Sequence, residues 1–167
     1  MNHVTLRAME PEDLDLLYRI ENDPELWGVS ATNVPYSRYT LHDYIAQSAG
    51  NIYVDGQVRL IIETPDHEVV GIADVVCFDA KNCRAEVGLV IERRHRGQGY
   101  GSQALTQLLH YSLRVLHLHQ LYAFVPVDNK PSIALFTKEG FSHENKIKDW
   151  LFDGKHYVDA LLMQKIF

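Results

Sequence analysis

Two hydrophobic periods alternate along the chain and predict its elements. Short runs rich in β-branched and aromatic residues are typical of strands, and they lie at residues 4–7, 58–63, 69–78, 84–91, 120–125, 144–152 and 157–166. Apolar residues recur at helical spacing over residues 14–22, in a segment that Ser37 can cap, over about four turns after Gly101, and over residues 131–138. We therefore expect a mixed α/β (α+β) fold.

The order of these elements predicts how the strands pair. The three strand runs between residues 58 and 91 are separated only by turn residues, which favours an antiparallel meander. A strand, a helix and a second strand then follow one another up to residue 125, and this crossover predicts a parallel pair. Asp153-Gly154, between the last two runs, indicates a hairpin.

The chain has no internal boundary. Residues 23–35 have the composition of a loop, but no repeat, low-complexity tract or Pro/Ser-rich linker divides the sequence. We expect one domain over residues 1–167, with a mostly antiparallel sheet flanked by helices.

Composition and charge narrow the range of partners. The chain has 16 Lys and Arg against 22 Asp and Glu, a formal net charge of -6, which opposes binding to a phosphate backbone, so no nucleic acid partner is expected. No apolar run has the roughly 20 residues that span a bilayer, and the start has no apolar leader segment. We therefore expect no membrane partner and a cytoplasmic location. The acidic residues between 10 and 25 form either a solvated helix face, which composition favours, or a rim that binds cations.

The cysteines and histidines do not form a metal-binding pattern. Cys77 and Cys83 flank a turn, and we expect both to be free thiols. The nine His residues are scattered, and no Cys/His set has the spacing of a zinc site. We predict no metal.

A glycine-rich segment joins a strand run to a helix run: Arg94-His95-Arg96-Gly97-Gln98-Gly99-Tyr100-Gly101-Ser102. Alternating glycines let the backbone adopt positive φ and approach a ligand closely, and the free N–H groups at a helix N-terminus attract phosphates. Two arginines add positive charge in an otherwise acidic chain. The segment lacks the GxxxxGK string of a Walker loop and the GxGxxG spacing of a Rossmann unit, which excludes both nucleotide sites.

Two motifs carry a resemblance to a known family. Arg96-Gly97-Gln98-Gly99-Tyr100-Gly101 resembles the (Q/R)xxGx(G/A) loop that binds the diphosphate of acetyl-coenzyme A (acetyl-CoA) in the GNAT superfamily of N-acetyltransferases. Residues 129–141, an Asn followed by a helix ending in Lys-x-Gly-Phe, resemble the second signature of that superfamily. The chain is most similar to the branch that contains spermidine N-acetyltransferases and ribosomal-protein N-terminal acetyltransferases. The resemblance implies an acetyltransferase that uses acetyl-CoA.

The resemblance also implies roles for individual residues. Val90 and Ile91 would offer main-chain groups to the pantetheine arm, and Asn129 would contact the cofactor near the opening of the parallel strands, although a helix N-cap is an equal alternative for it. The helix that includes Phe136 and ends at Lys138 would line the thiol end. The diphosphate would be held by Arg96, Gly97, Gly99, Gly101 and Ser102.

Acetyl transfer to an amine needs a proton acceptor, because an alkylamine of pKa near 10.4 is only about one part in 2,500 neutral at pH 7. Glu86 is our candidate for this catalytic role: it shares a strand face with Gly88 and Val90, and burial there would raise its pKa into a useful range. The alternative is a surface ion pair with Arg84 or a lysine.

The chain departs from the family at Phe136, where most members have a Tyr that is taken to protonate the coenzyme A sulfur. Phe136 has no proton to donate. A thiol of pKa near 8.5 still leaves unaided, so we expect a loss on the order of 10²- to 10⁴-fold unless another donor serves. Tyr122, Tyr157 and Thr137 are the candidates for that donor.

The sequence is compatible with three functions. The first is an N-acetyltransferase acting on a small cationic amine such as a polyamine, which the acidic N-terminal region favours. The second has the same chemistry on a protein N-terminus. The third is a catalytically weak sensor that binds coenzyme A. An exposed strand edge near the C-terminal hairpin makes a homo-oligomer reasonable.

Overall fold

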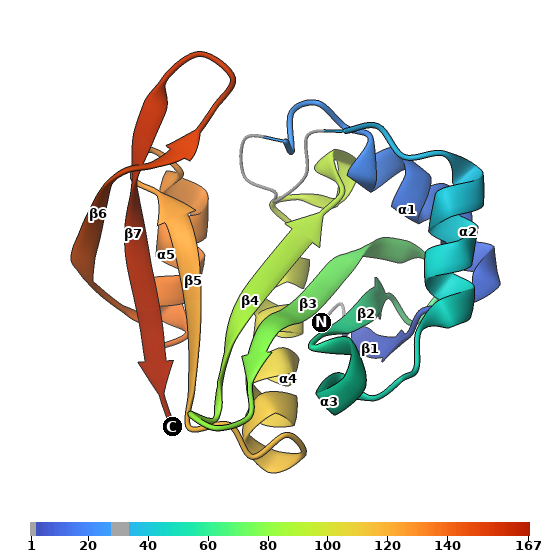
Figure 1. The fold of residues 1–167 in the computed structure, drawn as a ribbon, viewed down its shortest axis with the longest axis horizontal. Helices are drawn as coiled ribbons and strands as arrows, with labels where there is room; N and C mark the ends of the chain where they lie inside the picture. The colour runs from blue at the N-terminus through green and yellow to red at the C-terminus, as the bar shows by residue number, and fades with distance from the viewer. Residues whose placement is uncertain (1–2, 28–33) are drawn as a thin grey trace.

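The computed structural model describes residues 3–27 and 34–167. Seven strands form one sheet in the order β1-β2-β3-β4-β5-β7-β6 (Figure 1). The strands are β1 (Thr5–Ala8), β2 (Val58–Glu63), β3 (Val69–Asp79), β4 (Arg84–Ile91), β5 (Gln120–Pro126), β6 (Ser142–Phe152) and β7 (Tyr157–Ile166). The helices are α1 (Leu14–Glu21), α2 (Arg38–Gln47), α3 (Ile52–Asp55), α4 (Tyr100–Arg114) and α5 (Lys130–Lys138), with short 3-10 helices η1 (Pro11–Asp13) and η2 (Arg93–His95).

All seven expected strands and all four expected helices are confirmed, and most of their bounds lie within two residues of the expectation. Ser37 caps α2 as expected, because its hydroxyl accepts a hydrogen bond from the N–H of Thr40 at 3.0 Å. The sequence did not indicate α3, since a helix of four residues is too short to show a periodicity. Of the loop expected at 23–35, residues 28–33 lie outside the described part of the chain.

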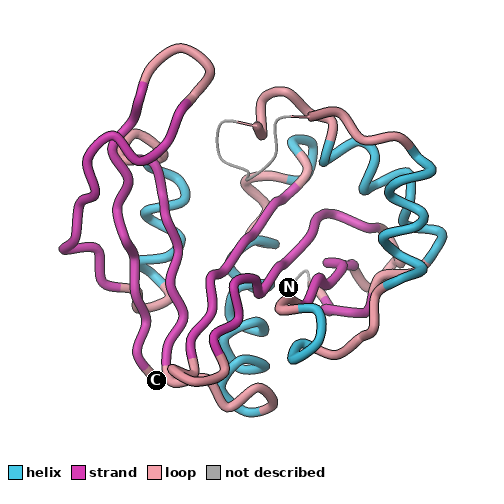
Figure 2. Tube along the Cα trace, in the orientation of Figure 1, coloured by secondary structure: helices cyan, strands magenta, loops and turns pink. Residues whose placement is uncertain are grey.

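The pairing of the strands is antiparallel at every interface except that between β4 and β5, which confirms a mixed, mostly antiparallel sheet. The parallel contact is short: it joins residues 84–86 of β4 to residues 120–122 of β5. Beyond Glu86 and Tyr122 the two strands diverge (Figures 1 and 2). The divergence leaves the second half of β4 without a strand partner on one side among residues 3–27 and 34–167.

Helices cover the two faces of the sheet in separate groups. One core places α4 and α5 against β4 and β5, with Leu105, Leu121 and Phe136 among its buried side chains. The second core places α1 and α2 on the opposite face, where Leu17 and Ile61 are fully buried. Glu86 therefore belongs to the face that carries α1 and α2, since its neighbours Ala85 and Val87 pack into the first core.

The last strands form the more exposed part of the fold. β6 is an edge strand, and nearly all its side chains are exposed. Gly154, at the hairpin between β6 and β7, has a φ of 96°, as the sequence predicted for a turn of this kind. Both cysteines are free, as expected. None of the helices in residues 3–27 and 34–167 has the length and apolar character needed to cross a membrane.

Candidate active site

The glycine-rich segment forms a tight loop between β4 and α4. Gly97 and Gly99 have φ values of 77° and 85°, in the left-handed region that favours glycine, and a Cβ at either position would meet only open space. Gly99 is also the N-cap of α4, and no side chain in the described part of the chain caps this helix. The N–H groups of its first turn therefore point out of the loop toward an external acceptor.

Two other residues of this segment have a different role. A Cβ on Gly101 would lie at ordinary contact distance, 3.5 to 3.8 Å, from side-chain atoms of Leu135, Ile91 and Leu89, so this residue lies where α4 packs against β4 and α5. The Ser102 hydroxyl donates to Glu139 Oε1 at 2.8 Å and accepts from Lys138 Nζ at 3.1 Å. These bonds connect the end of α5 to the start of α4. Because they occupy the hydroxyl of Ser102, its main-chain N–H is the group that could bind an anion.

The register of β4 determines which main-chain groups face the divergence. The N–H of Glu92 donates to the carbonyl of Val70 at 2.9 Å, so the main-chain groups of Glu92 face β3. Alternate residues of a strand direct their main-chain groups to the same side. The main-chain groups of Val90 therefore also face β3, whereas those of Leu89 and Ile91 face the unpartnered side. Contrary to the expectation, the register therefore turns the main-chain groups of Val90 away from the open side, which carries those of Leu89 and Ile91. A contact of either with a pantetheine arm stays a prediction. The Ile91 carbonyl accepts a hydrogen bond from Arg96 Nε at 3.0 Å on that side.

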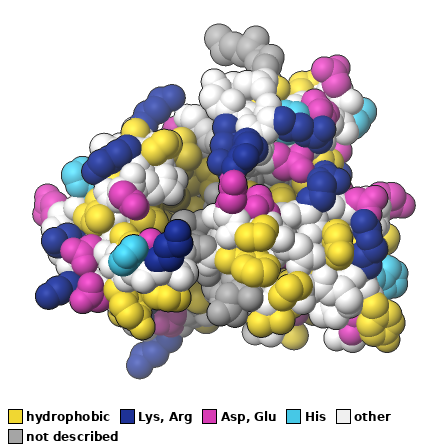
Figure 3. All heavy atoms as spheres, turned by 90° about the horizontal axis from the view of Figure 1, so that it is seen from above, with side chains coloured by type: hydrophobic (Ala, Val, Ile, Leu, Met, Phe, Trp, Pro, Cys, Tyr) yellow, Lys and Arg dark blue, Asp and Glu magenta, His cyan; other side chains and the backbone are white. Residues whose placement is uncertain are grey.

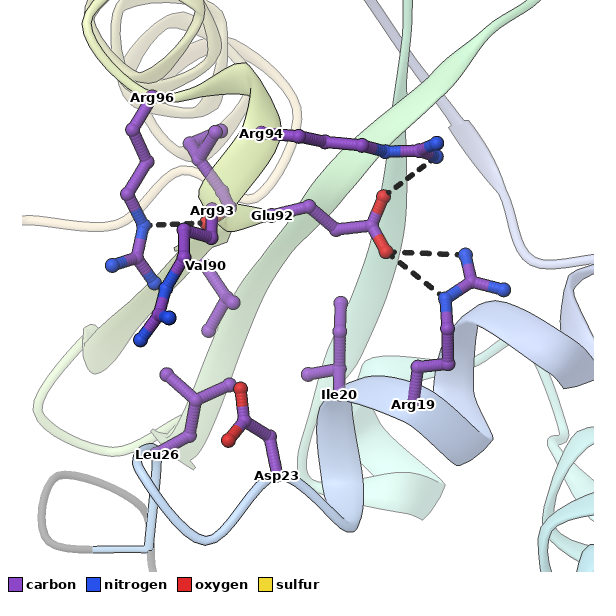
Figure 4. Close-up of a pocket in the computed structure, with 10 residues that line it drawn as sticks. Arg19, Ile20, Asp23, Leu26, Val90, Glu92, Arg93, Arg94 and Arg96 are labelled. Atoms are coloured by element: carbon purple, nitrogen blue, oxygen red, sulfur yellow. Dashed lines mark hydrogen bonds and ion pairs between the residues drawn. The ribbon is translucent and has the colours of Figure 1, made fainter.

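A cavity of about 650 Å³ lies beside the end of β4. Its lining includes Val90 and Ile91 and four arginines, of which Arg19 and Arg94 donate to opposite oxygens of Glu92 at 3.1 Å (Figure 4). Basic and acidic side chains are interspersed over this end of the molecule (Figure 3). Arg96, one of the four, donates to a neutral carbonyl, and no carboxylate of the described residues pairs with it. Sequence reasoning missed Arg19, because it lies on α1, far from the loop in the chain.

Glu86 is half-buried at the point where β4 and β5 separate. Burial raises its pKa, and a hydrogen bond from the thiol of Cys77 lowers it in part. The alternative of a surface pair with Arg84 is wrong, since Arg84 Nη2 lies 3.2 Å from Asp79 Oδ2 instead. Glu86 can therefore act as a partly desolvated proton acceptor.

Cys77 reaches Glu86 because of an irregularity in β3. The register with β4 shifts between Val76 and Asp79, and Cys77 has a φ of 51° there. The sequence carried no signal for this contact, since a bulge cannot be located from the alternation of residues alone.

Asn129 and Phe136 lie on α5. The Asn129 side chain accepts from the N–H of Ser132 at 3.3 Å, which confirms the N-cap. Phe136 is only 6% exposed, and its ring meets that of Phe141 edge to face at 4.9 Å. A contact of either residue with a cofactor stays a prediction.

An ionic cluster lies on the same sheet face as Glu86. Arg59 donates to both carboxylate oxygens of Asp74 at 2.9 Å and to Glu21 at 2.5 Å. Burial lowers the pKa of Arg59, but the two carboxylates raise it by more, so the guanidinium stays charged. Asp74 lies against Gly88, whose Cβ would be 3.3 Å from that of Asp74. Sequence reasoning missed this cluster because its members come from α1, β2 and β3.

A row of aromatic rings leads away from Glu86. Tyr122 is its register partner on β5, and the rings of Tyr122 and Phe124 have centroids 5.7 Å apart. Trp150 of β6 continues the row at 5.3 Å from Phe124. The row thus extends from the point of divergence toward the β6–β7 hairpin.

A second cavity, of about 300 Å³, lies near the end of β5. It is formed by the segment after α1, the connection from β5 to α5, and the β6–β7 hairpin. Three carboxylates line it, Glu25, Asp128 and Asp153, and none of the described residues that line it is Lys or Arg. Glu25 pairs with Arg93, which lines the first cavity. The two cavities therefore differ in the sign of their charge.

Comparisons with known proteins agree with the arrangement of these elements. A family model described as an acetyltransferase (GNAT) domain matches residues 3–142. An uncharacterized N-acetyltransferase of Bacillus licheniformis is 32% identical over 151 residues, which cover 88% of this chain and 83% of that protein. Spermidine N(1)-acetyltransferase of Escherichia coli is 27% identical over 161 residues, which cover 96% and 84%. The crystal structure of spermidine N-acetyltransferase from Vibrio cholerae in complex with CoA and spermine has a TM-score of 0.89 and 23% identity, covering 98% of this chain and 95% of that one.

Proposed function

The chain belongs to the GNAT acetyltransferase family and is an N-acetyltransferase, and from this premise we propose that it transfers the acetyl group of acetyl-CoA to a polyamine. The observation that supports a polycationic acceptor is the second cavity, which three carboxylates line. Carboxylates at this density attract and orient protonated amines, and the net charge of -6 acts in the same direction.

The position of this cavity favours a long acceptor. Asp128 follows the end of β5, and the four residue steps along β5 from Tyr122 to Pro126 span about 13 Å. An extended triamine can therefore place one end at Glu86 and a distal ammonium among the carboxylates, whereas a short amine reaches only one of the two. The relative from Escherichia coli that acts on spermidine supports the same class of acceptor.

The residues around the glycine loop fit the diphosphate of acetyl-CoA. The loop presents the uncapped N-terminus of α4, and Arg96 carries a charge that no described carboxylate neutralises. Leu89 and Ile91 offer main-chain groups along the unpartnered side of β4, in the manner of an added strand. Acetyl-CoA supplies the thioester carbonyl that the amine attacks.

Glu86 serves as the base in this reaction. It receives the proton that the attacking amine loses, either directly or through water, and burial gives its carboxylate the raised pKa that suits this role. Its location where β4 and β5 separate supports this role, because an acetyl group carried along the open side of β4 would arrive there.

Replacing Arg96 with Ala should weaken the binding of coenzyme A about tenfold, because a charge-assisted contact with a phosphate is lost. Isothermal titration calorimetry measures the effect. The control is Arg114→Ala, which removes an exposed arginine from the last turn of α4, at the end of the helix away from the loop, and should leave the affinity unchanged. Equal affinities for both variants would contradict the placement of the diphosphate at this loop.

Replacing Asp128 with Asn should raise the KM for spermidine about threefold, the size expected of one exposed ionic contact. The KM for a short monoamine should stay unchanged, because that acceptor does not reach the second cavity. Steady-state kinetics with both amines checks the expectation. A parallel rise for the two amines would show that Asp128 acts by some means other than contact with a distal ammonium.

The proposed function is tested with labelled acetyl-CoA and a panel of acceptors: spermidine, a diamine, an aminoglycoside and an N-terminal peptide. Transfer to spermidine with the highest kcat/KM is the expected result. Transfer to the peptide alone would reject a polyamine in favour of a protein N-terminus. Binding of coenzyme A without transfer to any amine would favour a sensor.

A further inference from the structure

The departing sulfur of coenzyme A needs a proton, and position 136 cannot provide it. Phe136 has no hydroxyl, and its ring is buried edge to face against Phe141. The inference that follows rests on the proposed function, since it concerns the leaving group of the same transfer.

Three hydroxyl groups are the sequence-level candidates for a donor, and the structure separates them. Thr137 is exposed on α5. Tyr157 is 69% exposed at the start of β7, where its ring contacts that of Phe152 at 5.2 Å. Tyr122 is half-buried on β5, directly across from Glu86. It is the one of the three that lies at the divergence of the strands.

The register places Tyr122 and Glu86 on the same face of the sheet. Residues directly opposite each other in neighbouring strands point their side chains the same way, and this pair is the last one before β4 and β5 separate. The two side chains therefore lie at the narrow end of the divergence.

The thiol end of the cofactor is directed to the same place. A diphosphate at the glycine loop lies beyond the end of β4, and the arm follows the unpartnered groups of Ile91 and Leu89 back along the strand. From Ile91 to Glu86 there are five residue steps, a span of about 16 Å, which an extended pantetheine arm can cover. The sulfur then lies beside the pair formed by Glu86 and Tyr122.

We propose that the Tyr122 hydroxyl protonates the sulfur of coenzyme A as it leaves. The amine nitrogen forms a bond to the acetyl carbon, the bond from that carbon to sulfur breaks, and the sulfur takes the phenolic proton. Glu86 receives the proton lost by the amine and returns it to the Tyr122 oxygen. One amine and one thioester become one amide and one thiol, and both side chains regain their starting protonation.

The electrostatic surroundings of Tyr122 suit this role. Burial raises the pKa of the phenol, and the nearby negative charge of Glu86 raises it further, so the hydroxyl holds its proton at neutral pH. The Tyr122 ring is held in place by its edge contact with Phe124. The proton is therefore present on a positioned ring before the sulfur begins to leave.

Replacing Tyr122 with Phe removes the hydroxyl and keeps the ring contact with Phe124. We expect kcat with acetyl-CoA and spermidine to fall about 10²-fold, the lower end of the range for a general acid, because a thiol leaves tolerably unaided. The affinity for coenzyme A should stay the same. Tyr157→Phe is the matched control, since it removes a hydroxyl from an exposed ring, and it should retain full activity.

A second acetyl donor distinguishes proton transfer by Tyr122 from a structural role of this residue. The selenoester analogue of acetyl-CoA releases a selenol, which is a much stronger acid than a thiol and leaves without protonation. The loss caused by Tyr122→Phe should therefore shrink to less than about threefold with the selenoester. Because both donors are compared on one variant, the ratio does not depend on how much of that variant is folded.

The outcomes separate the two proposals. Two results would overturn the role of Tyr122: an equal loss with the thioester and the selenoester, or full activity of Tyr122→Phe with acetyl-CoA. In either case, wild-type transfer to spermidine would still uphold the proposed function. Absence of wild-type transfer to any amine would reject the proposed function itself. Partial recovery of the Tyr122→Phe variant by a further Phe136→Tyr exchange would support the need for a donor on either side of the sulfur.

Discussion

Replacing Glu86 with Gln is expected to lower kcat/KM for amine acetylation by about 10²- to 10⁴-fold, the contribution of a positioned general base. The amide has nearly the shape of the carboxylate but cannot accept the proton of the attacking amine. The hydrogen bond from the Cys77 thiol and the contacts of the strand do not require a charge at this position, so folding should be retained. Steady-state kinetics with acetyl-CoA and spermidine measures the loss.

The pH profile should change with the same exchange. Burial raises the pKa of Glu86, so the wild-type carboxyl group takes up a proton at a higher pH than an exposed carboxyl group does. Below that pKa the base is blocked, and kcat/KM falls on acidification. In Glu86→Gln this step should be absent, leaving only the titration of the acceptor amine.

Glu144→Gln provides the control for charge. It makes the same exchange on an exposed side chain of β6, and both rate and pH profile should match the wild type. If Glu86→Gln retained kcat/KM within about threefold, the assignment of Glu86 as base would be wrong, and a water chain leading to solvent would have to accept the proton.

Replacing Arg59 with Met is expected to lower the free energy of unfolding by about 3 kcal/mol, because it leaves the largely buried carboxylates of Asp74 and Glu21 without their counterion. Methionine fills much of the same volume, so the loss reports the unpaired charges more than a cavity. Urea denaturation at neutral pH measures the difference.

An exposed ion pair serves as the control for this exchange. Arg38 pairs with Asp15, and their side chains are 53% and 70% exposed. Arg38→Met should cost less than about 1 kcal/mol, since water screens both charges. An equal loss in the free energy of unfolding for the two variants would show that burial does not strengthen the contribution of the Arg59 ion pairs.

The geometry of the glycine loop could be predicted from the sequence because it depends on the local backbone. Gly97 and Gly99 do adopt positive φ, and α4 does begin at the loop without a side-chain cap. These features follow from residues that are neighbours in the chain, so one stretch of sequence contains the whole signal.

The positions of Val90, Leu89 and Tyr122 relative to the open side of β4 could not be predicted in the same way. Hydrophobic alternation located β4, but it does not say which side of the strand has a partner. That depends on the antiparallel register with β3 and on the short parallel contact with β5. A one-residue change in either register would exchange Leu89 for Val90 at the open side.

The amino-acid sequence alone determined the elements and the glycine loop, and it proposed Glu86 as a candidate base, because propensity, glycine geometry and side-chain chemistry act over a few residues. Only the tertiary structure decided that the thiol of Cys77 and the phenol of Tyr122 lie beside Glu86, and that three carboxylates gather in a second cavity near the hairpin. These groups come from separate strands and loops, and the long-range pairing that brings them together is fixed by packing of the whole sheet rather than by any local pattern.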